Sequence, residues 1–322
     1  MKLRQLLPNH KTLTDIFMLW VGTVGGAGLA FLIQMILPRY LERDEFGTFS
    51  SALAINNLLL PLAGFGVCDI ILKTFGIEGW GAIRWLKGAF GLTTFMTIFV
   101  LICLTLWAVL GPHNAVMRDM ILLLLPVVPA QVVTQLIGSR MQLEERYKMY
   151  VIWHIVQHIL RFMIIAFLFM LFIPNGLYLS VVTYSVISIG VTLLGIKDLH
   201  GMINGRFNLK HHLPSTNINN SKETVKATDV AKSSFPYGLA GVFSNIYFQT
   251  TIIYIQYYIG SEAAGAYSIA FTILIAVLIL PNTIYGQYLI PKIHRWSAHD
   301  QNKLLKVYRY GVGVMLDRKS VV

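Results

Sequence analysis

A stripe of polar side chains interrupts the apolar segment between residues 149 and 172. Its members recur at intervals of three and four residues, which places them on one face of a helix: Tyr147, Tyr150, His154, Gln157, His158 and Arg161. A polar face that ends in a guanidinium suits a water-filled lumen that accepts a phosphate or an acidic sugar. The reason is that a guanidinium pairs with phosphate through two parallel hydrogen bonds.

Arg161 lies near the middle of this segment, where a charge at the centre of a bilayer costs at least ~2.5–3.5 kcal/mol. Such a side chain needs a cavity or a partner. Either it faces the lumen, or it pairs inside the bundle with a carboxylate or with helix-end carbonyls. The acidic residue Asp69 is expected near one end of its own segment, away from mid-depth. His154 and His158 could exchange protons, although hydrogen bonding between helices is the commoner role of such histidines.

Amides form a second set of candidates within apolar segments. They are Asn245, Gln249 and Gln256 in 234–258, Gln131 and Gln135 in 119–140, and Asn56 and Asn57 in 47–71. Contact with a ligand and hydrogen bonding between helices both fit these positions. The sequence holds no phosphate-binding loop, no His-Glu-x-x-His and no Gly-x-Ser-x-Gly. We therefore expect no catalytic residue, no metal site and no cofactor.

The elements that carry these residues are long uncharged runs. The chain has 322 residues, of which 55% are hydrophobic and 13% are charged, whereas soluble domains carry roughly 25% charged residues. No charged residue occurs from Phe17 to Leu37, from Phe46 to Cys68 or from Gly88 to Met117. Runs of about 18 or more such residues are typical of membrane-spanning helices, and the alternation of barrel strands is missing. The sequence predicts an all-α membrane protein, a polytopic helical bundle.

Eight spans are predicted, and a ninth begins near Asn302. Their ranges are 15–38, 47–71, 88–110, 119–140, 149–172, 176–197, 234–258 and 266–290. Segments on the N-terminal side of the membrane carry 20 Lys and Arg residues, against three on the other side: Arg39, Arg43 and Arg118. Because cytoplasmic loops are enriched in Lys and Arg, the N-terminus is expected in the cytoplasm. This distribution between loops also argues against a nucleic-acid surface.

A polar stretch divides the chain into two parts. Residues 200–232 are rich in Asn, Ser, Thr and Lys, a composition that cannot bury enough apolar surface to fold. We predict a six-helix lobe over residues 1–199, a cytoplasmic linker over 200–232 and a partial second lobe over 233–322.

The two parts contain related segments. Residues 41–52 align with residues 259–270 at one offset, which pairs Gly47 with Gly265 and Ser50 with Ser268. Asp44 pairs with Glu262 and Phe49 with Tyr267 in the same alignment. Each segment links the first and second spans of its part. Internal repeats of this kind are typical of transporters with two pseudo-symmetric bundles and a site between them.

The same residues carry a family resemblance. Residues 28–49, with Pro-Arg-Tyr-Leu-x-x-x-Glu-Phe-Gly-x-Phe-Ser running on to Ser50, resemble the opening of the O-antigen and polysaccharide flippase family. Phe235-Pro-Tyr-Gly238, Gly265-Ala-Tyr-Ser268 and Leu289-Ile-Pro-Lys-Ile293 resemble the start of that family's second lobe. This family belongs to the multidrug/oligosaccharidyl-lipid/polysaccharide exporter superfamily. Its members have about twelve spans in two six-helix lobes, so the chain is expected to be a C-terminally truncated member.

The resemblance implies a flippase, not an enzyme, in the bacterial cytoplasmic (inner) membrane. Its cargo would be a lipid-linked oligosaccharide such as an O-antigen unit, and its partners membrane lipids and the polysaccharide polymerase machinery. The two lobes would rock around a central cavity. Candidate lumen residues are Arg161, His158, His154, Gln157, Tyr150, Asn245 and Gln249. Two alternatives stay open: a related exporter of drugs or a peptidoglycan lipid precursor, and a membrane-embedded enzyme of glycan assembly. The short outer loops argue against the enzyme.

Overall fold

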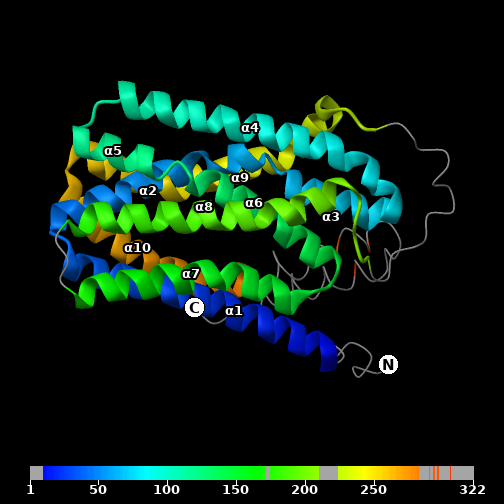
Figure 1. Cartoon of the computed structure of the whole chain (residues 1–322), viewed down its shortest axis with the longest axis horizontal. Coiled ribbons are helices and arrows are strands. Elements are labelled where there is room, and N and C mark those ends of the chain that lie inside the picture. The colour runs from blue at the N-terminus through cyan, green and yellow to red at the C-terminus, as the bar shows by residue number, and fades with distance from the viewer. Residues whose placement is uncertain are drawn as a thin grey trace.

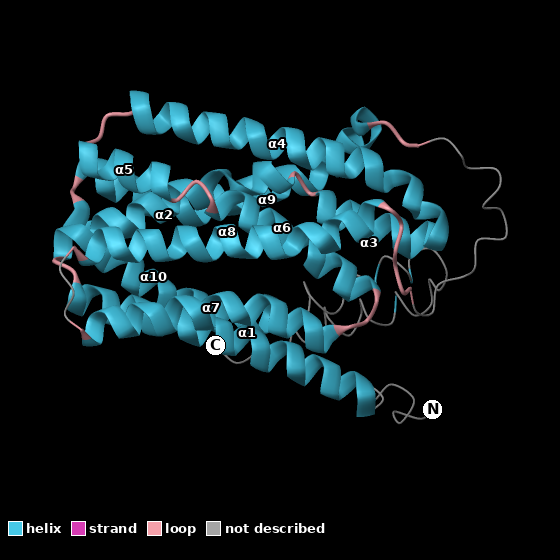
Figure 2. Cartoon of the chain, viewed as in Figure 1, coloured by secondary structure: helices cyan, strands magenta, loops and turns pink. Residues whose placement is uncertain are grey.

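The structure is a computed structural model that describes residues 10–171, 175–209 and 224–282, together with Ile290, Ile293, Trp296 and Leu305. Within these residues every regular element is a helix (Figure 2). The elements are α1 (His10–Tyr40), α2 (Arg43–Gly64), α3 (Val67–Glu78), the short 3-10 helix η2 (Gly79–Ala82), α4 (Ile83–Leu110), α5 (Ala115–Leu123), α6 (Val127–Leu143), α7 (Tyr147–Met170), α8 (Gly176–Ile203), α9 (Ala227–Tyr258) and α10 (Ser261–Asn282).

The helices run alternately between two ends of an elongated bundle (Figure 1). One end, called the basic end here, holds the start of α1, the end of α3, the α6–α7 connection, the end of α8 and the start of α9. The far end holds the turns that join α1 to α2, α4 to α5, α7 to α8 and α9 to α10. These positions place the predicted basic loops at one end.

Helices cover the described residues of all eight predicted spans, but two of the spans are interrupted, and residues 283–289 of the eighth lie outside the described residues. The span predicted at 47–71 breaks at Phe65 and Gly66, which both adopt left-handed backbone angles (φ 42° and 67°) between α2 and α3. The span predicted at 119–140 breaks between α5 and α6, where Pro126 is the N-cap of α6. Proline lacks the N–H that a continuous helix requires, so the break falls where the backbone cannot pair. The predicted ninth span lies almost wholly outside the described residues.

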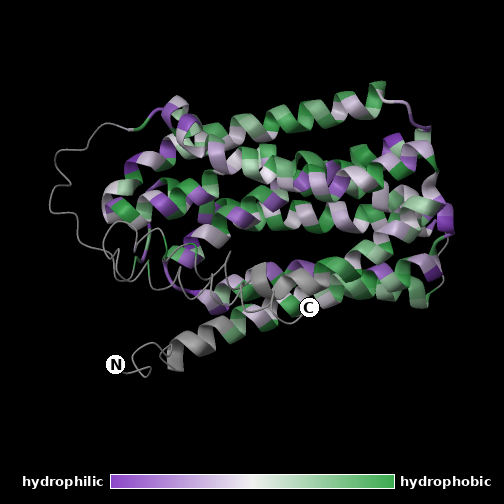
Figure 3. Cartoon of the chain, turned by 180° about the vertical axis from the view of Figure 1, so that it is seen from behind, coloured by the Kyte–Doolittle hydropathy of each residue, from purple (hydrophilic) through white to green (hydrophobic). Residues whose placement is uncertain are grey.

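Five stretches are long and apolar enough to cross a membrane. They are Phe17–Tyr40, Arg43–Leu110 (68 residues, covering α2 to α4), Ala115–Leu143, Tyr147–Met170 and Gly176–Ile203. The more polar α9 lies outside this set, and α10 contributes a shorter apolar helix, Ser261–Ile275. Large apolar side chains such as Phe95, Ile102 and Leu194 are exposed along the helices, and hydrophilic residues gather toward the two ends (Figure 3). An exposed apolar belt of this kind suits a lipid environment.

The largest buried cluster draws mainly on α2, α3, α4, α5 and α6, includes Phe49, Phe75 and Leu104, and also takes in residues of α1, α7, α8 and α9. Helix α1 packs along α7, and α9 packs mainly along α2 and also contacts α3 and α4. Helix α10 packs against α2, α9 and α1. The name first lobe is used below for α1–α8 and the name second lobe for α9 and α10. Residues 210–223 of the predicted linker lie outside the described residues, and the helices reach into its two ends, at Ile203 and Ala227.

Candidate functional site: a cavity between the two lobes

A cavity of about 310 Å³ lies between α2, α3 and α6 of the first lobe and α9 of the second lobe. Its polar lining is mostly uncharged and consists of the amides of Gln135 and Asn245 and the hydroxyls of Ser244 and Tyr237. One carboxylate, that of Asp69, completes it. These groups can donate and accept several hydrogen bonds to one polar ligand.

The break between α2 and α3 forms one wall of this cavity. Gly66 packs against α9 so closely that a Cβ atom there would lie 2.6 Å from the backbone nitrogen of Gly238. Its φ of 67° also favours glycine. Gly238 is the matching small residue on α9, because a Cβ there would lie 3.1 Å from the carbonyl carbon of Phe65. Two glycines therefore let the broken helix and α9 meet backbone to backbone, as in transporters whose interrupted helices border the site.

Asp69 lies in the first turn of α3, directly after this break. The positive end of the helix dipole favours a carboxylate at that position. Asp69 forms no hydrogen bond or ion pair with another described residue. Lys73, one turn further along α3, points to the ring of Tyr237 with its ammonium nitrogen 5.8 Å from the ring centroid. Asp69 is not among the predicted lumen residues, because the sequence predicts it near one end of its segment. The neighbouring Gly64-Phe65-Gly66 is the signal that could have found the break and the site.

Arg161, the predicted centre of the lumen, lies elsewhere, inside the first lobe. Its side chain is only 5% exposed. Its Nη2 donates to the Ser188 hydroxyl on α8 at 3.2 Å, and its guanidinium carbon lies 4.4 Å from the ring centroid of Tyr184. Its Nε has no hydrogen-bond partner among the described residues. Arg161 is therefore buried within the first lobe, and its partners are a hydroxyl and a ring, not a carboxylate or helix-end carbonyls.

The other members of the α7 stripe also lie within the first lobe. The side-chain amide of Gln157 donates to the hydroxyl of Thr134 on α6 at 2.8 Å. Tyr150, His154 and His158 line a second cavity, of about 250 Å³, between α7 and the glycine-rich face of α1. The rings of Tyr150 and His154 are in contact, with centroids 4.3 Å apart and planes tilted by 37°. The stripe is therefore one helix face in contact with three neighbours, and it does not line the cavity between the lobes.

Asn245 is the predicted site residue that lines the interlobe cavity. Its amide also donates to the backbone carbonyl of Asn57 on α2 at 2.6 Å, so it joins the two lobes at the cavity's edge. Gln249, one turn further along α9, lines neither of the two cavities. Of the seven predicted lumen residues, three share the α1–α7 cavity and one reaches the interlobe cavity.

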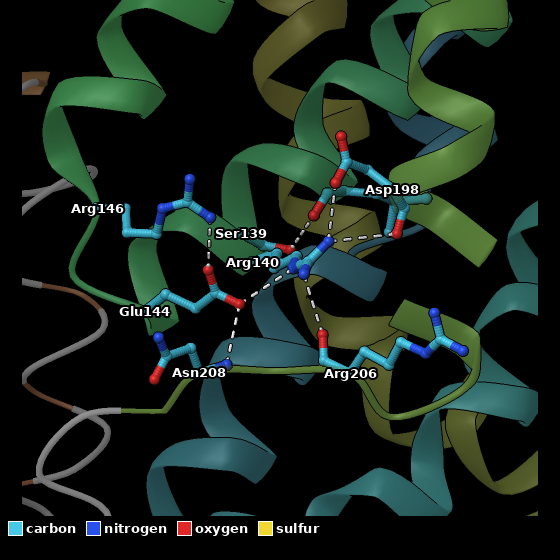
Figure 4. A network of polar contacts seen from close by, with 8 residues as sticks. Ser139, Arg140, Glu144, Arg146, Asp198, Arg206 and Asn208 are labelled. Atoms are coloured by element: carbon cyan, nitrogen blue, oxygen red, sulfur yellow. Dashed lines mark hydrogen bonds and ion pairs between the residues drawn. The ribbon is translucent and has the colours of Figure 1, made fainter. Parts of the chain in front are cut away.

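A polar network fastens the basic end of the first lobe (Figure 4). Glu144, only 1% exposed, accepts hydrogen bonds from Arg140 at 3.1 Å, from Arg146 at 3.1 Å and from the backbone N–H of Asn208 at 3.1 Å. Arg140 also reaches Asp198 on α8 at 2.9 Å. The network joins α6 and α8 to the chain that leads toward α9. Among the described residues no three His, Cys, Asp or Glu side chains could hold a metal ion together.

Comparisons with known proteins agree with this architecture. No curated protein sequence matches the chain. The sequence profile of the family described as polysaccharide biosynthesis protein matches residues 12–297. A crystal structure of MATE in complex with MaL6 superposes with a TM-score of 0.61 at 13% identity, covering 93% of this chain and 68% of that one. At this identity the likeness concerns the fold alone.

The family match spans most of the chain, and the fold is similar to that of the MATE structure. The long apolar helices indicate a multi-pass membrane protein. The predicted family resemblance is confirmed: the chain belongs to the polysaccharide biosynthesis protein family and has a MATE-like all-helical fold.

Proposed function

We propose that the chain is a flippase that moves a lipid-linked oligosaccharide, such as a surface polysaccharide unit, across the bacterial cytoplasmic membrane by alternating access. The observation that carries this proposal is the interlobe cavity, whose amides, hydroxyls and carboxylate converge between two lobes of an exporter fold. The family supplies the connection to polysaccharide assembly. A polysaccharide polymerase would act on the exported unit and is the partner that this function implies.

The cavity chemistry fits sugar hydroxyl groups. Each hydroxyl donates one hydrogen bond and accepts others, so amides such as Gln135 and Asn245 can serve it in both directions. Asp69 adds an acceptor, and the Tyr237 ring adds an apolar surface against which a sugar can pack. The chemistry therefore favours hydroxyl-rich cargo.

The size of the cavity bears on the mechanism. About 310 Å³ is at the lower end of the range for small-ligand pockets. A complete oligosaccharide headgroup requires more room, and the second lobe can supply it by moving away from α2 and α3. The lipid tail would stay in the bilayer beside the opening. This volume change is what alternating access requires.

The orientation in the membrane follows from charge. The basic end carries the start of the chain and its Lys- and Arg-rich connections, which favours a cytoplasmic location. The interlobe cavity includes the first turn of α3 and Gln135 of α6, which lie toward that end. The headgroup would enter from the cytoplasm, where lipid-linked units are assembled.

The proposal can be tested in cells that lack their own copy of this gene, by measuring the surface glycan that each introduced variant restores. Gln135→Ala and Asn245→Ala remove cavity amides and should lower the exported glycan several-fold at equal protein level. Phe243→Ala, next to the cavity residue Ser244 but 62% exposed on the outside of α9, is the matched control and should export normally. Normal export by both cavity variants, or failure of the wild-type gene to restore any glycan, would refute the proposal.

One observation favours a second candidate, a drug exporter. Asp69 is a carboxylate without an ion-pair partner among the described residues, and such a group attracts cationic compounds. If the cargo is a cationic drug, Asp69→Asn should raise the sensitivity of cells to that drug and leave surface glycan unchanged. Loss of glycan with unchanged drug sensitivity favours the flippase.

A further inference from the structure

The lobes meet in layers between the cavity and the far end. Beside the cavity, Asn245 of α9 donates to the backbone of Asn57 on α2. The next layer is apolar and consists of the buried side chains of Ala54, Ile252 and Ala264 from α2, α9 and α10. Along α2 and α9, about 14–16 Å of helix separate the cavity from the far-end contacts. These layers lie between the cavity and the far end.

A set of polar contacts closes the last layer. Arg43 donates to Glu262 at 2.8 Å, and the Thr48 hydroxyl donates to the Ser261 hydroxyl at 3.4 Å. Gln256 bridges the helices: its oxygen accepts from Ser51 at 2.8 Å and its nitrogen donates to Ser261 at 2.9 Å. We call this set the far-end latch; it consists of Arg43, Thr48, Ser51, Gln256, Ser261 and Glu262.

Two glycines allow α2 and the start of α10 to approach each other closely at the latch. A Cβ atom at Gly47 would overlap the backbone carbonyl of Ser261. A Cβ atom at Gly265 would lie 3.0 Å from the Phe46 ring and 3.3 Å from the Cα of Gly47. Gly47 and Gly265 are equivalent positions of the internal repeat. The two copies of the repeat therefore touch each other at equivalent residues, as expected for two halves that meet on a pseudo-twofold axis.

We propose that the far-end latch is a gate, closed in this conformation, that must part each time cargo leaves through the far end. Its contacts join α2 to α9 and α10. Because α2 and α9 also line the cavity, opening the far end moves the cavity walls as well. The Arg43–Glu262 pair is 84% and 65% exposed, and exposed pairs contribute little, so this pair opposes the opening of the latch only weakly. The gate rests on the alternating-access part of the proposed function.

A reversible disulfide tests the gate in the full chain. Thr48→Cys and Ser261→Cys replace hydroxyls 3.4 Å apart, within the reach of a disulfide, after Cys68 and Cys103 are changed to alanine. A protease site between residues 210 and 223 separates the two halves on a gel unless the disulfide joins them. Thr48→Cys with Thr272→Cys is the control pair, because Thr272 lies about 16 Å further along α10.

Oxidation should join most molecules of the test pair and few of the control pair. Joined protein should lose export at least tenfold and regain it with reductant. Halves that stay separate in the membrane would overturn the proposed latch. Unchanged export by joined protein would overturn its role as a gate.

A labelling experiment on purified protein tests whether the latch controls access at the far end, and it does not depend on the identity of the cargo. A single cysteine at the buried position Ser51 should react slowly with a thiol reagent. The Gly47→Val change forces the lobes apart at the latch and should speed this reaction several-fold, whereas Gly91→Val, where a Cβ has open space, should not. If labelling responds in this way while wild-type protein restores no glycan, the proposed cargo is wrong and the gate stands. Equal labelling in both variants would refute the gate.

Discussion

Replacing Arg161 by leucine distinguishes a structural role of this cation from a role in contacting cargo in a lumen. The guanidinium is buried between α7 and α8 with one hydrogen bond, to Ser188, and one ring contact, to Tyr184. With so few contacts, the free-energy cost of burying this cation should be nearly as large as the stability that its contacts contribute. Removing the charge and removing its partner should therefore have very different effects on stability.

The magnitudes follow from the two contacts. Leucine at 161 loses a desolvated cation–π contact of about 2 kcal/mol and an interhelical hydrogen bond of about 0.6 kcal/mol. It also removes the cost of a charge at mid-membrane, about 2.5–3.5 kcal/mol. The net change in the free energy of unfolding should be within about 1 kcal/mol of zero.

Removing the partner instead should be costly. Tyr184→Leu leaves the cation with a single hydroxyl and also ends the edge-to-face contact with Phe49, whose ring centroid is 5.4 Å away. Adding an aromatic pair of about 0.5–1.5 kcal/mol to the lost cation–π contact gives a destabilisation of about 3 kcal/mol. Tyr184→Phe keeps both ring contacts and is the matched control.

The assay is reversible unfolding of purified protein in mixed detergent micelles, with export measured in the same variants. In the Arg161→Leu background, Tyr184→Leu should cost only the Phe49 contact, so a double-mutant cycle should give a coupling of about 2 kcal/mol. A larger loss of stability for Arg161→Leu than for Tyr184→Leu would refute this reasoning. A stable Arg161→Leu protein that exports nothing would instead give Arg161 the lumen role.

Three further predictions concern packing and polar contacts. Glu144→Gln weakens charge-assisted hydrogen bonds of a buried carboxylate and should lower the free energy of unfolding by about 1.5–3 kcal/mol. Asp198→Asn changes a half-exposed residue and should cost less than about 1 kcal/mol. Chemical unfolding of the two variants compares these costs. Gly195→Ala drives a methyl group into Val133 and should cost about 1–3 kcal/mol, while Gly190→Ala on the same helix meets open space and should be neutral or slightly stabilising in thermal unfolding. Asn245→Ala removes the hydrogen bond to the Asn57 backbone and should cost about 0.6–1.7 kcal/mol, and equal stability of variant and wild type in the same unfolding assay would contradict that contact.

The sequence by itself determined the helices, their direction and the division of charge. Uncharged runs such as Phe17–Leu37 must be helical in a bilayer, because hydrocarbon offers no partner for an unpaired backbone group. The alternation of basic and short connections set which helix ends lie together. The repeat around Gly47 and Gly265 was visible as a shared spacing. These features are local, so they can be read without knowing any neighbour.

Only the tertiary structure decided which faces meet. The α7 stripe was predicted as one polar face, but periodicity does not say what a face contacts: Arg161 meets α8, Gln157 meets α6, and His158 meets α1. Asp69 was judged by its depth along a straight helix, and the break at Gly66 placed it in a cavity wall instead. The two glycines of the repeat touch because the lobes pack around a common axis. Contacts between distant segments depend on packing in three dimensions, and a single sequence does not encode them as a local pattern.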